Sequence, residues 1–580
     1  LEVIERDDAV EVRYRATCAN PDDQRIDYRI ECCVDAHRGV TCKSECTTST
    51  DFLTARCGFC VLHPIEGVAG APAIVEHGAG GIERGLFPLM IDPWQPFKDI
   101  RVIEHRLTDG RWLRCELDGD TFEMEDQRNW SDASFKTYSR PLELPWPYVL
   151  EAGGVFSQAV RVAVRDGDAA ATEPKIEDDG QGEPVAIIEL RNGPRTFPEL
   201  GLLIAPDELD AMVRHIDVLR ATAPQRVSLH YDPLAGHDID LLNRYADLVR
   251  QIDARATLEY ALPGVDAPAI EIAALATQIE QSGLAVSGLM ISPSVHRQSN
   301  PPGSISPPCP PLDDVYASAR RMFPNLRLSG GMLSYFTELN RKRPPLSMVD
   351  EVVHATCPIV HAADDTSVMQ TLEAVAHITR SCRALIGAQP YSIGPLSIGM
   401  RQNPYGSRTM PNPDRQRVAM ADDDPRQRGL FGAAWLVGYL AAVADADLAS
   451  LTLGGMTGPR GYIDARGRPY PIAAVATTLA LLGGHARIDC VSTGAGGIAA
   501  FAGHRSTGER VVVVANLTST MQAFRFASAG AITGREAARI SIIDESTVAD
   551  YRSGLLTTSD ERLDDRERRL KPFACLIASY

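Results

Sequence analysis

The chain has 580 residues, and its 58 Lys plus Arg against 76 Asp plus Glu give a formal net charge of −18 at pH 7. Most of this surface would repel a phosphate backbone, so we expect no nucleic-acid partner. Apolar residues make up 44% and charged residues 23%, which is typical of folded globular protein. No stretch reaches the roughly 18 consecutive apolar residues of a membrane span, so we expect no membrane partner.

Cysteine usage bears on the compartment. Among the 13 cysteines, Cys57 and Cys60 form a CxxC pair, but no second CxxC or pair of histidines completes a zinc set. We therefore predict buried free thiols, which favour a reducing cytoplasm. The first residues, LEVIERDDAV, lack the basic and apolar regions of a secretory signal, so we expect no export.

The N-terminal region of the chain has the residue pattern of an antiparallel sheet. Residues 1–166 contain short alternating segments such as VEVRYRATC and RWLRCELDG, separated by Asp, Gly and Pro turns. This pattern predicts a β-sandwich domain. Residues 167–183 have almost no apolar content and many charges, which predicts an interdomain linker.

From residue 184 to 484, short apolar runs alternate with amphipathic helical segments such as 240–252 and 367–382. Eight βα units of this total length predict an α/β fold, the (β/α)8 TIM barrel, with a doubly wound open sheet as the rival. Residues 485–580 return to β character and predict a second antiparallel β-sandwich. The eight expected barrel strands are AIIELR (186–191), RVSLHYD (226–232), ATLEYAL (256–262), VSGLMIS (286–292), LRLSGG (326–331), VVHATCPIV (352–360), ALIGAQPYSI (384–393) and LASLTLG (448–454).

The active site of such a barrel lies at the carboxyl ends of its strands. Glu338, Asn340 and Arg341 follow the fifth expected strand, and His361 and Asp364 follow the sixth. Because neighbouring strands lie about 4.8 Å apart, these side chains could converge on one small substrate. Such a set could activate water and stabilise an oxyanion.

Structural roles are the alternatives at each of these positions. Asp364 or Asp365 could cap the helix expected at 367–382, and we favour capping for Asp365. Glu338 and Arg341 could form an ion pair at the barrel rim. His354 lies within the sixth strand and is either a core histidine or a substrate-binding residue.

Other polar residues could also reach the site. Glu189 and Glu259 lie on expected strands and could point into the barrel or outward, so both are reserve candidates. The loops 299–312 and 402–428 follow the fourth and seventh strands, where long loops usually form lids or substrate walls. Residues 122–138 show no regular period and predict a contact-making loop, with a solvated loop as the alternative; its polar members are Glu125, Asp126, Arg128 and Asn129.

Five ordered strings together resemble the D-apionate lactonase family of bacterial sugar catabolism. They are GFCVLHPIEG (58–67), WQPF (94–97), EMEDQRNW (123–130), YFTELNR (335–341) and VHAADD (360–365). The resemblance implies a β domain, a glycosidase-like barrel and a second β domain in that order, and hydrolysis of the lactone of D-apionic acid. From this resemblance we expect departures from the family at the front of the chain, where its first strands would be missing, and in the extra N-terminal cysteines.

The resemblance supplies no catalytic residue, so the expected roles rest on chemistry. Opening a lactone needs an aimed water, donors for the tetrahedral oxyanion and an acid for the leaving ring oxygen. We predict Glu338 as the general base and His361 as acid or oxyanion donor, oriented by Asp364 or Asp365. The substrate, a small sugar lactone, would be bound by Asn340, Arg341 and His354, with a second wall from Glu125, Asp126, Arg128 and Asn129. A neutral substrate needs no net positive field in its pocket.

Two other functions stay open, and a metal is the remaining question. A glycoside hydrolase would pair Glu338 with Glu259 or Glu189, and a sugar-binding module would have lost its catalyst. We expect no cofactor and no metal; the alternative is a divalent ion held by His354, His361 and a nearby carboxylate. The sequence does not determine the oligomeric state.

Overall fold

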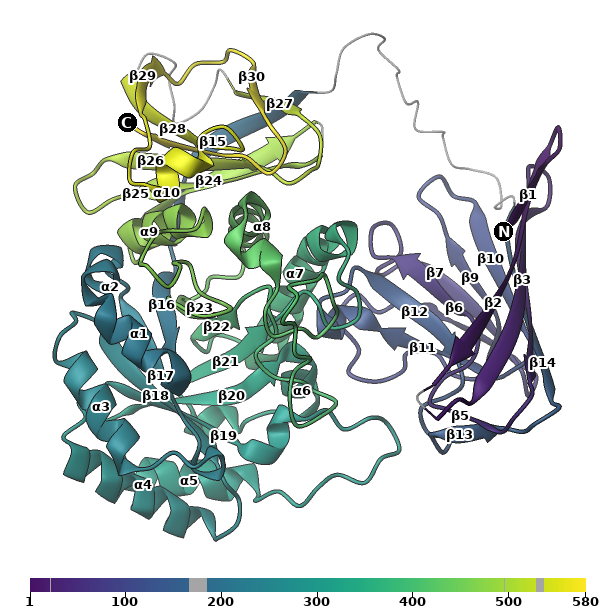
Figure 1. The fold of residues 1–580 in the computed structure, drawn as a ribbon, viewed down its shortest axis with the longest axis horizontal. Coiled ribbons are helices and arrows are strands. Elements are labelled where there is room, and N and C mark those ends of the chain that lie inside the picture. Colours follow the sequence, from purple (N-terminus) through teal and green to yellow (C-terminus); the bar gives the residue numbers. More distant parts are fainter. Residues whose placement is uncertain (21, 166–184, 495, 528–536) are drawn as a thin grey trace. The chain divides into compact units, whose positions relative to one another are not determined.

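The computed structural model describes residues 1–580 except 21, 166–184, 495 and 528–536 (Figure 1). The chain divides into two compact units, one formed mainly by residues 1–129 and 133–165 and the other mainly by residues 185–299 and 307–580. The predicted linker, 167–183, falls outside the described residues. Among the helices that are described, none combines the length and apolar character of a membrane span.

The first unit is built on one 12-stranded antiparallel sheet. Its principal path runs β1-β2-β3-β4-β14-β10-β9-β11-β12-β6, and β7 and β8 branch from β9. Phe87, Phe97 and Phe135 lie in its core. The strands are β1 (Glu2–Glu5), β2 (Ala9–Ala19), β3 (Arg25–Asp35), β4 (Gly39–Thr48), β6 (Cys60–Pro64), β7 (Pro72–His77), β8 (Ile82–Leu86), β9 (Ile100–Arg106), β10 (Trp112–Asp118), β11 (Phe122–Asp126), β12 (Ser134–Ser139) and β14 (Val155–Arg165), with β5 (Phe52–Thr54) and β13 (Tyr148–Leu150) as a separate pair.

The prediction of a loop at residues 122–138 is wrong. These residues form β11, a 3-10 turn at Gln127–Trp130 and β12. Almost every residue of both strands is buried, so neither strand shows the alternation that marks a half-exposed strand. The 13 cysteines are free thiols, as predicted, but only Cys115, Cys357, Cys382 and Cys575 are buried; Cys18 and Cys60 are exposed, and the others are partly exposed.

The second unit contains a closed barrel of eight parallel strands, which confirms the predicted fold class. The strands are β16 (Glu199–Ile204), β17 (Arg226–Tyr231), β18 (Arg255–Leu262), β19 (Gly288–Pro293), β20 (Arg327–Tyr335), β21 (Glu351–Thr356), β22 (Tyr391–Leu396) and β23 (Ser450–Leu453). The outer helices are α1 (Leu209–Arg214), α2 (Ile216–Thr222), α3 (Ile239–Val249), α4 (Pro268–Ser282), α5 (Leu312–Met322), α6 (Phe336–Arg341), α7 (Asp365–Ile386), α8 (Leu430–Ala442) and α9 (Ile472–Leu482).

One predicted barrel strand is wrong. Residues 186–191 belong to β15 (Val185–Thr196), which lies in the C-terminal sheet, and β16 is the first strand of the barrel. The burial patterns explain the difference. The first half of β15 alternates between buried and half-buried residues, as in a sandwich, whereas β16 is buried almost throughout, as a strand covered on both faces must be.

The C-terminal part of this unit is a nine-stranded sheet in the order β29-β28-β31-β26-β25-β24-β15-β27-β30. Its core includes Ile188, Val512 and Phe524. Its remaining elements are β24 (Ala486–Thr493), β25 (Ile498–His504), β26 (Arg510–Asn516), β27 (Gln522–Phe526), β28 (Ala537–Ile543), α10 (Val548–Arg552), β29 (Ser559–Arg562), β30 (Arg568–Leu570) and β31 (Cys575–Ser579).

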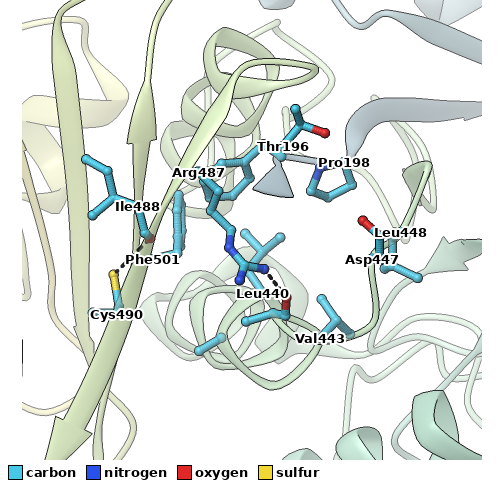
Figure 2. A pocket seen from close by; sticks show the side chains of 14 residues that line it. Thr196, Pro198, Leu440, Val443, Asp447, Leu448, Arg487, Ile488, Cys490 and Phe501 are labelled. Carbon is cyan, nitrogen blue, oxygen red and sulfur yellow. Dashed lines mark hydrogen bonds between the residues drawn. The ribbon is translucent and has the colours of Figure 1, made fainter. Parts of the chain in front are cut away.

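A small cavity of about 40 Å³ lies where this sheet packs on the barrel (Figure 2). Phe501 of β25 and Arg487 of β24 face Leu440 and Val443 at the end of α8. The Arg487 guanidinium donates to the backbone carbonyl of Ala444 just beyond that helix. This contact satisfies a carbonyl at the end of α8 and attaches the sheet to the barrel.

Candidate active site

A cavity of about 780 Å³ opens at the carboxyl ends of the barrel strands. Strands β16 to β19 contribute the residues at or just after their ends, and the loops after β22 and β23 complete the wall. The predicted wall loop 402–428 does border this cavity. The polar and charged lining residues are Asp207, His230, Asp232, His237, Ser294, Arg297, Gln298, Arg401, Gln402, Asn403, Ser407, Arg408, Thr409 and Arg460.

His230 lines this cavity and is paired with Glu259, which lines a separate cavity inside the barrel. They are direct partners in the parallel register of β17 and β18. The His230 Nδ1–H donates to Glu259 Oε1 at 2.7 Å, and Arg401 Nη1 donates to Glu259 Oε2 at 3.1 Å. Within the described part of the chain no hydrogen bond involves His230 Nε2. That nitrogen therefore keeps its lone pair for a ligand.

Burial and charge set the protonation of this pair. Burial and the nearby Arg401 cation lower the pKa of His230, against the opposing effect of Glu259. Burial opposes ionisation of Glu259, but Arg401 and the hydrogen bond from His230 together hold its pKa well below the usual range. At neutral pH the pair is a neutral imidazole oriented by a carboxylate, which is the arrangement of a general base.

A second ion pair lies beside it. Asp232 Oδ2 and Arg297 Nη1 are 2.6 Å apart, and Asp232 Oδ1 accepts the backbone N–H of Leu234 at 3.0 Å. The ring of His237 lies 5.8 Å from the ring of His230, and its Nδ1 accepts the backbone N–H of Asp232 at 2.9 Å. These contacts fix the rim of the cavity on the side of β17.

Glu208 lies behind the wall, directly after β16. Its side chain is buried, and Arg460 Nη2 is 3.7 Å from its Oε1. Neither carboxyl oxygen has a hydrogen-bond partner among the described residues. Burial raises the pKa of Glu208 to about 8. This carboxyl group is therefore largely protonated at neutral pH.

The predicted base, Glu338, is not among the residues that line this cavity. Glu338 is fully buried in α6, with Lys342 Nζ at 2.8 Å and Arg341 Nη1 at 3.7 Å from its carboxylate. Arg341 also donates to Ser299 Oγ at 3.1 Å, and Asn340 is buried in the same helix. This is the ion pair that the sequence left as the alternative. The catalytic roles of these residues stay predictions.

His361 also does not line this cavity. Its Nδ1 is 2.7 Å from Asp132 Oδ2, and its Nε2 is 3.3 Å from the Tyr405 hydroxyl. Asp364 instead accepts the backbone N–H of Ser367 at 2.9 Å as the N-cap of α7. The prediction that Asp365 caps this helix is wrong, because Asp365 is its first residue and pairs with Arg426 at 3.2 Å.

His354 lies in the barrel core. Its Nε2 is 2.7 Å from the Tyr391 hydroxyl, and its Nδ1 is 2.8 Å from the carbonyl oxygen of Ala355. Burial lowers the pKa of His354 to about 4. These contacts match the core histidine that the sequence left as the alternative, and its predicted substrate contact is not tested by them.

The predicted second wall forms a packed cluster within the first unit. Asp126 and Arg128 are fully buried and pair at 2.7 Å, and Arg128 also donates to the carbonyl oxygen of Pro88 at 2.7 Å. Asn129 donates to the carbonyl oxygens of Asp92 and Asp126. Glu125 pairs with Lys136 at 3.1 Å. These contacts hold the segment around residues 88–92, and the role as a substrate wall stays a prediction.

No group of three or more His, Cys, Asp or Glu side chains suited to a metal occurs in the part of the chain that the structure describes. The two reserve glutamates have separate locations. Glu259 lines a cavity in the barrel interior, whereas Glu189 lies on β15 of the C-terminal sheet and binds Arg191. His230 was missed, although it stands one residue before the end of β17, level with Glu259.

Three family models match the chain. They describe a D-apionate lactonase N-terminal domain over residues 1–167, a TIM barrel domain over 200–484 and a C-terminal immunoglobulin-like domain over 495–578. A D-apionate lactonase of Brucella anthropi is 46% identical over 541 residues, which cover 92% of this chain and 87% of that protein. The chain therefore belongs to the D-apionate lactonase family, as its sequence strings indicated.

Solved structures with similar folds include two glycoside hydrolases. The GH51 arabinofuranosidase of Xanthomonas axonopodis pv. citri is 12% identical with a TM-score of 0.49, over 68% of this chain and all of that chain. A family 39 glycoside hydrolase of Bacteroides cellulosilyticus is 11% identical with a TM-score of 0.42, over 92% of this chain and 97% of that chain.

Proposed function

We propose that this protein hydrolyses a sugar-acid lactone in the barrel-mouth cavity, and that D-apionolactone is its substrate. The observation that carries the proposal is the His230–Glu259 pair, in which Nδ1 lies 2.7 Å from Oε1 and His230 lines a polar cavity of about 780 Å³. The substrate follows from the relative named as a D-apionate lactonase and from the family models that span the chain.

The reaction begins with proton transfer. His230 Nε2 takes a proton from a water molecule while the water oxygen forms a bond to the lactone carbonyl carbon. The imidazolium that results is stabilised by Glu259, whose carboxylate already accepts its Nδ1–H. The carbonyl oxygen gains the negative charge of the tetrahedral intermediate, and the guanidinium groups of the cavity wall supply the donors that stabilise it.

The second step opens the ring. The oxyanion collapses back to a carbonyl, the bond from that carbon to the ring oxygen breaks, and His230 returns its proton to the departing oxygen. One water is consumed and one hydroxy acid is formed, so His230 ends neutral and ready for the next cycle. A single histidine thus acts as base and then as acid.

The experiment is a panel of aldonolactones, including D-apionolactone, assayed with a pH indicator beside nitrophenyl glycosides. We expect turnover of lactones only. In His230→Asn we expect kcat to fall by about 10²- to 10⁴-fold, the range typical of a lost general base. His504→Asn, on β25 of the C-terminal sheet, is the matched control and keeps full activity.

Glu338→Gln belongs in the same panel because Glu338 is the base predicted from sequence. With His230 as the base, Glu338→Gln keeps kcat and loses only thermal stability. A loss of kcat in Glu338→Gln with full activity in His230→Asn would overturn the assignment and support Glu338. Turnover of glycosides in place of lactones would overturn the proposed function itself.

A further inference from the structure

The barrel-mouth cavity is rich in arginine although the chain carries a net charge of −18. Arg297, Arg401, Arg408 and Arg460 line it, against two aspartates, Asp207 and Asp232. A cavity with this lining suits an anionic ligand, whereas a lactone is neutral.

Two of these cations already have close carboxylate partners. Arg297 pairs with Asp232 at 2.6 Å, and Arg401 makes two hydrogen bonds to Glu259. Their charges are largely neutralised within the protein. Arg460 differs, because the carboxyl group nearest to it is Glu208 at 3.7 Å, beyond normal hydrogen-bond distance.

Glu208 is confined beside Arg460 by a glycine-rich loop. A Cβ added at Gly455 would lie 2.6 Å from Glu208 Oε2, and one added at Gly458 would lie 2.5 Å from Oε1. The carboxyl group of Glu208 therefore packs directly against this loop, and Gly458, with a φ of +72°, occupies a backbone conformation that favours glycine.

The protonation state of Glu208 determines whether a carboxylate neutralises the positive charge of Arg460. Burial raises the pKa of Glu208 to about 8, with Asp207 acting in the same direction and Arg460 and Arg401 opposing it. Of the other titratable groups close to Arg460, burial keeps the Cys357 thiol neutral, with a pKa of about 12, and holds the pKa of Tyr335 far above its usual value. With Glu208 protonated, no carboxylate of the described residues lies within 4.0 Å of the Arg460 guanidinium.

We propose that Arg460 anchors the carboxylate of the ring-opened sugar acid, and that Glu208 limits this binding to conditions in which its own carboxyl group is protonated. The inference deepens the proposed function, because it assigns a product subsite to the same cavity. When Glu208 ionises, its carboxylate becomes the counter-ion of Arg460 and competes with the sugar acid. Affinity for the product therefore falls as the pH rises through about 8.

Calorimetric titration of the full chain tests this with D-ribonate and its neutral counterpart ribitol between pH 6 and pH 9.5. A guanidinium–carboxylate contact predicts that ribonate binds about 10-fold or more tightly than ribitol at low pH, and that this ratio approaches one at the alkaline end. Both probes carry the same number of carbons, so the ratio isolates the carboxylate.

Three variants test which residues cause the preference for ribonate over ribitol. Arg460→Gln should bring the ratio to about one at every pH, while Glu208→Gln, which mimics the protonated carboxyl, should keep it high and independent of pH. Arg466→Gln is the matched control, because Arg466 is exposed, lies six residues after Arg460 and does not line the cavity. If Arg460→Gln does not fold, Arg460→Lys keeps the charge but loses the planar fork, and a reduced ratio is expected.

The outcomes separate the two proposals. A ribonate preference that survives in Arg460→Gln, or a pH dependence that survives in Glu208→Gln, would overturn the product subsite. Lactone turnover with equal binding of ribonate and ribitol would overturn the subsite and leave the hydrolysis standing. Tight, pH-dependent ribonate binding without turnover of any lactone would overturn the hydrolysis and leave the subsite standing.

Discussion

Two buried carboxyl groups at opposite ends of the barrel, Glu351 and Glu208, differ in their hydrogen-bond partners. At the amino ends of the strands, Glu351 accepts hydrogen bonds from Ser329 Oγ at 2.9 Å, from Ser392 Oγ and from Arg226 Nη1 at 3.1 Å. At the carboxyl ends, both oxygens of Glu208 and the hydroxyl groups of Ser292, Ser294 and Thr457 lack hydrogen-bond partners among the described residues. Glu351 is thus satisfied internally, whereas Glu208 has no such partners.

The difference follows from what each end has to do. A buried carboxylate with several donors stabilises the fold and leaves little capacity for anything else. An unsatisfied buried group costs stability, and such groups persist where a ligand or a proton completes them. We call the amino ends of the strands, around Glu351, the closed end and the carboxyl ends, around Glu208, the open end. The comparison predicts that substitutions at the closed end change stability alone. Substitutions at the open end should change activity, ligand binding or pH dependence.

The largest expected effect is on how stability depends on pH at the open end. The folded-state pKa of Glu208, about 8, lies above its ordinary value of 4.5. The stability due to its protonated form is complete below pH 4.5 and is lost as the pH rises through about 8. In Glu208→Gln we expect that loss to disappear, which makes the variant about 4 to 5 kcal/mol more stable than the wild type above this range and equal to it at low pH.

Urea titrations at pH 5 and pH 9 measure this difference. Glu280→Gln, at an exposed position on α4, serves as control and should follow the wild type at both values. Parallel losses of stability with pH in Glu208→Gln and the wild type would show that Glu208 is not the group responsible.

At the closed end, Glu351→Ala should lower the free energy of unfolding by about 3 to 5 kcal/mol, because Arg226 loses a buried partner. Circular dichroism during urea denaturation provides the measurement. The kcat of the folded fraction should match the wild type, and Glu280→Ala should change stability by no more than about 0.5 kcal/mol. A fall in kcat for Glu351→Ala at unchanged stability would contradict the division between the two ends.

A smaller effect is expected for Glu259→Gln, which keeps the size of the side chain but removes the charge that orients His230 and binds Arg401. We expect kcat to fall by about 10²-fold, less than in His230→Asn. The pH profile of kcat/KM should also shift, because the pKa of His230 loses a neighbour that raises it. Full activity with an unshifted profile would remove Glu259 from the mechanism.

The smallest expected effect is that of chelation. We propose that the reaction needs no metal, so dialysis against EDTA should leave kcat unchanged, and adding zinc or magnesium should not increase it. Loss of activity on dialysis, with recovery when one divalent ion is added, would show that the reaction needs a metal ion.

The architecture could be predicted from sequence because it depends on local periodicity. The change from alternating segments to apolar runs with amphipathic helices located six of the eight barrel strands closely, whereas the predicted strand 384–393 begins in α7 and overlaps β22 only at residues 391–393. Strand β15 was misplaced because its partners, β24 and β27, are distant in sequence. The site was harder to predict for the same reason: Arg401 reaches Glu259 across 142 positions of chain, and Glu208 is distinguished by its lack of partners rather than by its residue type.

The place of β15 also bears on how the protein is made. This strand emerges from the ribosome before the barrel, yet it pairs with β24 on one side and with β27 on the other, both of which emerge after it. At typical rates of synthesis, both edges of β15 stay unpaired for roughly tens of seconds, until β24 and β27 have been made. Nascent chains that stop within the barrel would therefore expose an unprotected strand that is prone to aggregate.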